Sequence, residues 1–148
     1  MQFYYISWQK MHEMCFELAE KIVGVSEVEL LRHIVAISRG GLVVARILSD
    51  FLNLPIFNIA IESYEDIGKN KTPVITQDLG SADFKGKNIL LVDEICDTGK
   101  TFERAVGYLN SSVGDDLPVV PMGRTRRSAP TEILPIDTGG YITTLSRL

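Results

Sequence analysis

Apolar residues recur at spacings of three and four along several stretches of the chain, which is the pattern of helices with one buried face. The first stretch follows Ser7, whose side chain is suited to cap a helix, and it puts Trp8 on the apolar face as a core anchor. A capping-box pattern and two further periodic stretches predict helices over 27–32, 42–52 and 102–110.

Continuous apolar runs lie between these helices, and such runs are typical of strands that are buried on both faces. They predict strands over 34–37, 56–61 and 89–92, with weaker, proline-marked candidates over 119–122 and 132–136. From Glu62 to Lys87 the chain is polar and rich in breakers, which predicts a flexible flap with a hairpin around Val74–Gln77. The alternation of helices and strands predicts an α/β fold with a central, mostly parallel sheet flanked by helices.

The size and composition of the chain narrow the possible function classes. Its 148 residues favour one domain, and 45% hydrophobic with 23% charged residues are ordinary for a globular protein. A formal net charge of −4 argues against a general nucleic-acid binder, and no apolar run is long enough for a membrane span. The N-terminus lacks the layout of a signal peptide, and Cys15 and Cys96 lie far apart, so we expect free thiols and a cytoplasmic location.

Three acidic residues follow the apolar run 89–92 closely. Asp93 and Glu94 continue the predicted strand, Asp97 comes next, and residues 98–101 form a small polar turn before a helix. Backbone N–H groups in such a turn can bind a phosphate, and the carboxylates can hold Mg²⁺ or ribose hydroxyls. In an alternative interpretation, Asp97 only caps the helix that follows. A P-loop is excluded, because that motif needs a glycine where Glu94 stands.

A second loop with phosphate-binding chemistry, Ser38–Gly41, follows the predicted strand 34–37. Two adjacent glycines allow a close approach to the backbone, and Arg39 offers a planar guanidinium to a phosphate or diphosphate. Alone, this pattern also fits a plain strand-to-helix turn. Because ligands of parallel α/β sheets bind beyond the carboxyl ends of the strands, we expect this loop and residues 93–101 to meet across one crevice.

Taken with other parts of the chain, these two loops resemble a known family. The chain is similar to the type I phosphoribosyltransferases, and among them to small 6-oxopurine enzymes of the xanthine-guanine and hypoxanthine-guanine type. The resemblance includes Tyr4–Trp8, Ser38–Leu42, Ser63–Tyr64, the run VDEICDTGKT at 92–101, and Tyr141. It implies transfer of the 5-phosphoribosyl group from 5-phosphoribosyl 1-diphosphate (PRPP) to N9 of a 6-oxopurine, giving a nucleoside 5′-monophosphate and diphosphate in purine salvage.

The resemblance assigns both loops to PRPP. Asp93 and Glu94 would hold the ribose hydroxyls directly or through Mg²⁺, which is the expected cofactor, and Asp97 would act as the catalytic residue at N7 of the purine. The 5-phosphate would bind to the loop made by Asp97, Thr98, Gly99, Lys100 and Thr101, and the diphosphate to the loop made by Ser38, Arg39 and Gly40. The family often has a non-proline cis peptide in the diphosphate loop.

Other positions are implied to bind the base or to form a flap. Arg124, Tyr141 and Ile142 would bind the purine, and the ring of Tyr141 would stack on it. Ser63 and Tyr64 would begin the flexible flap over the active site. These five residues therefore complete the predicted site.

The resemblance also implies the domain organisation and the partners. One phosphoribosyltransferase domain over 1–148 would have a core of about 27–122 and a small C-terminal hood of about 123–148, completed by the N-terminal strand. We expect a homodimer or homotetramer whose small-molecule substrates are PRPP and a purine base. No nucleic-acid partner and no membrane span are expected.

The chain departs from the family's pattern at three places. Glu94 stands where the family nearly always has Asp, Arg124 stands where it has a lysine that reads the purine 6-oxo group, and the tail 143–148 lacks the usual aromatic and acidic residues. Because Arg and Lys are not interchangeable, a different base stays an alternative. A PRPP- or nucleotide-sensing regulator without transferase activity is the alternative from another class.

Overall fold

The computed structural model describes residues 5–24, 31–64, 72–80, 82, 84, 87–96, 99–113, 133–136 and 140–144. The elements in chain order are α1 Trp8–Val23, β1 Leu31–Ser38, α2 Gly41–Leu52, β2 Ile56–Tyr64, β3 Thr72–Gln77, β4 Asn88–Asp93, α3 Lys100–Val113, β5 Ile133–Ile136 and β6 Gly140–Thr144.

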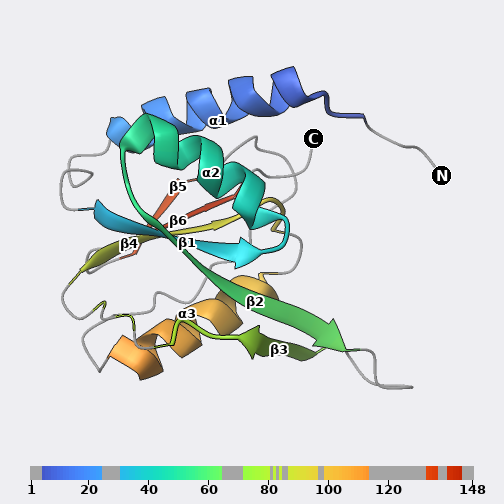
Figure 1. Ribbon diagram of the computed structural model, residues 1–148, viewed down its shortest axis with the longest axis vertical. Coiled ribbons are helices and arrows are strands. Elements are labelled where there is room, and N and C mark those ends of the chain that lie inside the picture. Colours follow the sequence, from blue (N-terminus) through green and yellow to red (C-terminus); the bar gives the residue numbers. More distant parts are fainter. Residues whose placement is uncertain are drawn as a thin grey trace.

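The strands of the described residues form one sheet in the order β3-β2-β1-β4-β6-β5 (Figure 1). Strand β1 pairs in parallel with β2 and with β4, and β4 pairs in parallel with β6. Strands β3 and β5 pair antiparallel with β2 and β6. The predicted α/β fold with a mostly parallel sheet is therefore confirmed.

Helices cover both faces of this sheet, with α1 and α2 on one face and α3 on the other (Figure 1). Alternate residues of the two central strands enter two separate cores. Towards α1 and α2, the strands contribute Ile34, Ala36, Leu90 and Val92. Towards α3, they contribute Val35, Ile37, Ile89 and Leu91. Burial on both faces explains why β1 and β4 read as unbroken apolar runs in the sequence.

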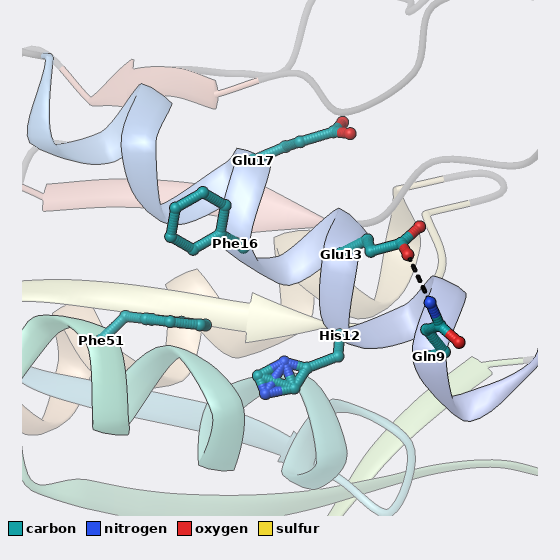
Figure 2. A pocket seen from close by; sticks show the side chains of 6 residues that line it. All are labelled: Gln9, His12, Glu13, Phe16, Glu17 and Phe51. Atoms are coloured by element: carbon teal, nitrogen blue, oxygen red, sulfur yellow. Dashed lines mark hydrogen bonds between the residues drawn. The ribbon is translucent and has the colours of Figure 1, made fainter.

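An aromatic contact on the outer side joins α1 to α2. The ring of Phe51 on α2 makes edge-on contacts with Phe16 and His12 of α1, with ring centroids 5.3 and 5.5 Å away. These rings and three polar side chains of α1 line a surface hollow of about 490 Å³ (Figure 2). None of the predicted site residues lines this hollow, which lies between α1 and α2.

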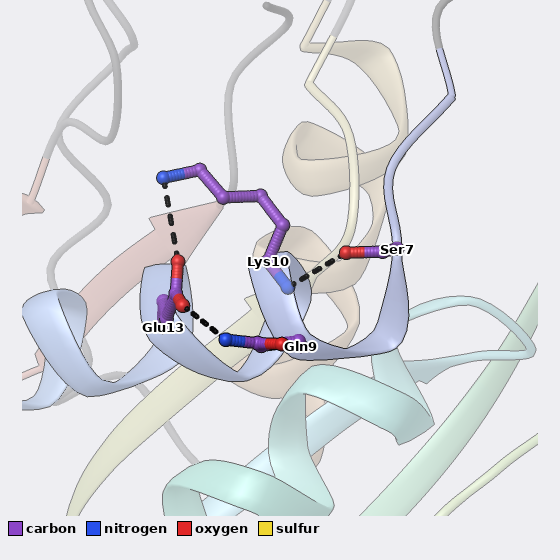
Figure 3. A network of polar contacts seen from close by, with 4 residues as sticks. All are labelled: Ser7, Gln9, Lys10 and Glu13. Carbon is purple, nitrogen blue, oxygen red and sulfur yellow. Dashed lines mark hydrogen bonds and ion pairs between the residues drawn. The ribbon is translucent and has the colours of Figure 1, made fainter.

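Helix α1 begins at the predicted cap. The Ser7 hydroxyl accepts a hydrogen bond from the backbone N–H of Lys10 at 3.1 Å, and Glu13 pairs with both Gln9 and Lys10 one turn further on (Figure 3). The prediction that Trp8 anchors the core is wrong, because its side chain is 75% exposed. Full burial on α1 begins only at Met14, so the first turn projects beyond the core.

The predicted helix over 27–32 is wrong where it can be compared. Leu31 begins β1, so pairing with β2 and β4 overrides the helix that the local capping pattern favours. Residues 27–30 lie outside the described residues. The candidate strand 119–122 also lies outside them. The predicted hairpin is confirmed as β2–β3.

Two strands of the C-terminal segment extend the central sheet. Strand β6 was not predicted, and it lies beside β4 with Thr144 opposite Asp93. Strand β5, predicted over 132–136, forms the edge next to it. This part of the expected hood is therefore part of the sheet, and the proposed hood over the base stays a prediction. No helix among the described residues is both long and apolar enough to cross a membrane.

Candidate active site

Hydrogen bonds hold both ends of the loop after β1. The hydroxyl of Ser38 donates a hydrogen bond of 2.9 Å to the carbonyl oxygen of Ile59 on β2. The Ser38–Arg39 peptide bond is cis, as the family resemblance implies. The carbonyl oxygen of Arg39 accepts a hydrogen bond from the N–H of Leu42 in the first turn of α2. The anchored ends of the loop leave the side chain of Arg39 exposed to solvent.

The loop after β4 begins with a buried carboxyl group. Asp93 is only 7% exposed, and its Oδ1 accepts a 2.9 Å hydrogen bond from the N–H of Glu94. Burial, followed by the neighbouring carboxyl of Glu94, raises the pKa of Asp93 to about 8. In the unliganded protein at neutral pH, the Asp93 carboxyl therefore favours its protonated form.

The two loops touch each other directly. A Cβ atom added to Gly40 would lie 1.9–2.1 Å from the carboxylate atoms of Glu94, and one added to Gly41 would lie 2.6 Å from the carbonyl oxygen of Val92. Gly40 has right-handed helical dihedrals, φ −64° and ψ −42°, which any residue can adopt. Gly41 is therefore needed for the close approach of the β4 backbone, whereas at Gly40 the end of a flexible side chain occupies the place of a Cβ. The prediction that the two loops meet is confirmed at this contact, and the crevice between them stays a prediction.

The acidic loop turns into α3 through Gly99. Its φ of +79° is a left-handed conformation that disfavours other residues, so glycine is required by the backbone here. The carbonyl oxygen of Gly99 accepts a hydrogen bond from the N–H of Glu103, and the helix follows from Lys100. The N–H groups of the first helical turn point towards this end of the sheet, where an anion could bind. Asp97 and Thr98 lie outside the described residues.

Comparison with known families decides the identity of this arrangement. Residues 7–112 match the phosphoribosyl transferase domain. The chain belongs to the phosphoribosyltransferase family. The resemblance seen in the two loops is thus confirmed over most of the chain.

Individual relatives agree with this assignment. The chain is 35% identical over 129 residues to hypoxanthine-guanine phosphoribosyltransferase from Schizosaccharomyces pombe, which covers 75% of this chain and 61% of that protein. It is 32% identical to a purine phosphoribosyltransferase from Pyrococcus horikoshii, whose crystal structure gives a TM-score of 0.64 and covers 74% of this chain and 70% of that one. The chain spans about three fifths of the length of the curated relatives it matches.

A more distant solved structure supports the fold alone. A hypothetical protein from Neisseria gonorrhoeae, solved with bound ppGpp, is 23% identical, gives a TM-score of 0.70, and covers 96% of this chain and 82% of its own. The coverage extends the likeness in fold to nearly the whole chain.

The acidic pair fits the Mg²⁺ ion that the phosphoribosyltransferase fold implies. Asp93 and Glu94 offer hard oxygen ligands, and a divalent cation would stabilise the ionised form of a carboxyl whose pKa burial has raised. No group of three or more potential metal ligands occurs within the described part of the chain. A site with two carboxyl groups suits Mg²⁺, because this ion keeps several waters and takes further oxygens from substrate phosphates.

The predicted flap begins where β2 runs past the end of β1. Ser38 at the end of β1 lies opposite Ala60, so Ser63 and Tyr64 extend past β1 and pair only with Pro73 and Thr72 of β3. The hairpin β2–β3 thus extends past the end of β1 as a two-stranded arm of the sheet (Figure 1). Its role as a flap stays a prediction.

The residues predicted to bind the base are not all brought together by the described structure. Tyr141 and Ile142 lie on β6 opposite Leu90 and Leu91, which is three and two positions before the register of Asp93. Their backbones are therefore set back from the carboxyl edge of the sheet. Arg124 lies outside the described residues, so its role in the base site stays a prediction.

Sequence reasoning missed the contact between Glu94 and Gly40. The Gly40-Gly41 dipeptide was interpreted as room for a ligand, whereas the structure fills that room with the acidic loop. A usable signal was present, because the glycine pair and the unusual Glu94 belong to two loops that we expected to meet at one end of the sheet.

Proposed function

We propose that this protein is a purine phosphoribosyltransferase that transfers the 5-phosphoribosyl group from PRPP to N9 of a 6-oxopurine. The observation that carries the proposal is the direct contact of the two loops, with Glu94 against Gly40 and the buried Asp93 carboxyl beside them. This geometry joins a diphosphate-type loop to a ribose- and phosphate-type loop in one place. The relatives named as hypoxanthine-guanine and xanthine phosphoribosyltransferases support the purine as acceptor.

The residues of the two loops bind different parts of the PRPP molecule. The exposed guanidinium of Arg39 binds the diphosphate and offsets the charge that grows on it as it leaves C1 of the ribose. The backbone N–H groups at the start of α3, with Lys100 and Thr101, bind the 5-phosphate. Asp93 and Glu94 hold the ribose hydroxyls and Mg²⁺, which when bound neutralises part of the negative charge of PRPP.

The base is held on the other side of C1. Asp97 faces N7 and holds or accepts a proton there, which orients N9 towards C1. The bond between C1 and the diphosphate oxygen breaks as the bond between N9 and C1 forms. The arm β2–β3 limits the access of water during this exchange. Arg124 and Tyr141 contact the purine, and Arg124 in place of a lysine sets which purine is preferred.

Release of diphosphate tests this proposal. The protein is incubated with Mg²⁺, PRPP and, separately, hypoxanthine, guanine, xanthine, adenine and uracil. We expect release with at least one 6-oxopurine and formation of the matching nucleoside 5′-monophosphate. Release with adenine or uracil alone would replace the purine proposal by another acceptor. Tight PRPP binding without release from any base would favour the sensing regulator.

Replacement of Asp97 by Asn tests the catalytic assignment. Because a general acid–base group contributes about 10²- to 10⁴-fold, turnover should fall by that order. The dissociation constant for PRPP should change little, since Asp97 acts on the base. Asp50→Asn, on the exposed side of α2, is the matched control. Equal turnover in Asp97→Asn and the control would contradict the role of Asp97.

The assembly and the location of the protein are part of this proposal as well. A homodimer or homotetramer in the cytoplasm fits a salvage enzyme with small-molecule substrates. Sedimentation at several protein concentrations would determine the oligomeric state.

A further inference from the structure

The side chain of Glu94 occupies the surface of the diphosphate loop. A Cβ atom added to Gly40 would lie 1.9 Å from the Cδ of Glu94 and 2.0 and 2.1 Å from its two carboxylate oxygens. The carboxylate therefore lies where a side chain at position 40 would begin. In this position it covers one side of the loop that we take as the diphosphate site.

The length of the side chain makes this contact possible. Glu94 begins on the acidic loop and reaches across the crevice to the loop that follows β1. An Asp at this position would carry its carboxylate on a side chain one methylene shorter, which withdraws it by roughly 1–1.5 Å. The contact with Gly40 is thus a property of Glu94 and of the glycine that faces it.

The charge of Glu94 conflicts with the charge of the proposed ligand. If the loop Ser38–Gly40 binds a diphosphate, a carboxylate already lies where that anion approaches the backbone. Two anions a few ångströms apart repel each other unless a cation lies between them. Either the carboxylate moves off Gly40, or the diphosphate arrives with a metal ion that both groups can share.

We propose that Glu94 is a displaceable occupant of the diphosphate loop and that it selects diphosphate groups that carry a divalent cation over metal-free ones. This inference rests on the proposed function, because it takes the loop Ser38–Gly40 as the diphosphate site. It adds a specificity role to a residue that otherwise only holds ribose or metal. In the unliganded protein the carboxylate covers Gly40, and a metal-bearing diphosphate draws it away.

Binding of inorganic diphosphate, measured by calorimetry with and without Mg²⁺, is the deciding experiment. Glu94→Gln keeps the length of the side chain and removes its charge. We expect it to bind metal-free diphosphate about tenfold more tightly than the wild type, since one repulsive charge is removed. The preference of the wild type for the Mg²⁺ complex should shrink by the same factor. Glu20→Gln on the exposed side of α1 is the matched control and should leave both affinities unchanged.

An unchanged or weaker affinity of Glu94→Gln for metal-free diphosphate would overturn the inference. If the wild type binds PRPP and transfers its sugar, that result leaves the proposed function intact. If the wild type binds neither PRPP nor diphosphate with or without Mg²⁺, the proposed function and this inference fall together.

Discussion

Where β1 and β4 end, small and acidic residues lie in direct contact, whereas aromatic rings pack together near the start of β1 and β2, on the α3 side of the sheet. At the first place, Gly41 lies against the backbone of Val92, and the buried Asp93 adjoins Glu94. At the second, the rings of His33, Phe57 and Phe84 meet edge-on with centroids 5.0–5.4 Å apart.

The difference separates residues to which the proposed function assigns binding from residues that stabilise the fold. Edge-on aromatic packing adds favourable contacts to the burial of apolar area. A buried carboxyl with a raised pKa and a backbone contact that excludes every side chain add no comparable stabilisation. The carboxyl ends of the strands are thus less stabilised than the α3 face, which is consistent with the binding site that we propose there.

The largest expected effect on stability comes from Gly41→Ala. Its Cβ would lie 2.6 Å from the carbonyl oxygen of Val92, a backbone atom in a central strand that cannot easily move. We expect a loss of about 2–3 kcal/mol in the free energy of unfolding, measured by urea denaturation.

Gly107→Ala is the matched control for Gly41→Ala. Gly107 lies within α3, and a Cβ there would meet nothing within 4 Å. Alanine should stabilise the helix by about 0.5–1 kcal/mol. If both variants changed stability by the same amount and sign, the contrast between the two regions would be wrong.

A smaller effect, an increase in the free energy of unfolding, is expected from Asp93→Asn. Because the folded pKa of Asp93 is raised to about 8, the folded protein keeps a proton that the unfolded chain releases near pH 4. The wild type should therefore lose stability as the pH rises from 4 to 8. Asparagine cannot ionise, so the variant should be more stable than the wild type at pH 8, by about 1–2 kcal/mol once solvent screening is allowed for.

Melting curves of the unliganded proteins between pH 4 and pH 8 would measure this effect. The variant should also bind Mg²⁺ and PRPP more weakly, because a ligand oxygen has lost its charge. Parallel pH profiles for the wild type and Asp93→Asn would contradict the raised pKa.

The smallest effect on stability is expected from a substitution of His33, on the α3 face of the sheet. Burial, followed by the charge of Lys87, lowers the pKa of His33, and its Nδ1 has no hydrogen-bond partner among the described residues. A lowered folded pKa means that stability is complete above about pH 6.5 and declines as the pH falls below it. His33→Leu should remove a small part of this acid sensitivity in thermal melts from pH 7 to pH 5. An acid sensitivity unchanged by the substitution would show that other groups cause it.

Local sequence patterns predicted those helices and strands whose pattern of apolar and capping residues matches their packing in the fold. The apolar runs of β1, β2 and β4 are buried in the central sheet, and the Ser7 cap starts α1 at the predicted place. The position of the acidic loop after a buried strand, next to the glycine pair, was predictable for the same reason. Alternation of helices and strands leaves few ways to arrange such loops.

Long-range contacts account for what the sequence did not predict. Phe84 lies in a stretch that reads as polar, yet it is 2% exposed because His33 and Phe57 surround it. Strand β6 begins at Gly140, the second of two consecutive glycines, and has little apolar signal; its pairing with β4 supplies hydrogen bonds that make it a strand. The contact between Glu94 and Gly40 joins residues far apart in the chain, so neither loop's own pattern predicts it, although the expected meeting of the two loops pointed to its place.

Calorimetric titration with PRPP in the presence of Mg²⁺ tests most directly the central claim that both loops form one site. The account predicts one PRPP per chain, with large losses of affinity in Arg39→Ala, from the loop after β1, and in Lys100→Ala, from the loop after β4. Arg46→Ala, an exposed arginine on α2 away from the loops, should bind like the wild type. Two PRPP molecules per chain, or wild-type affinity in either Arg39→Ala or Lys100→Ala, would contradict the account.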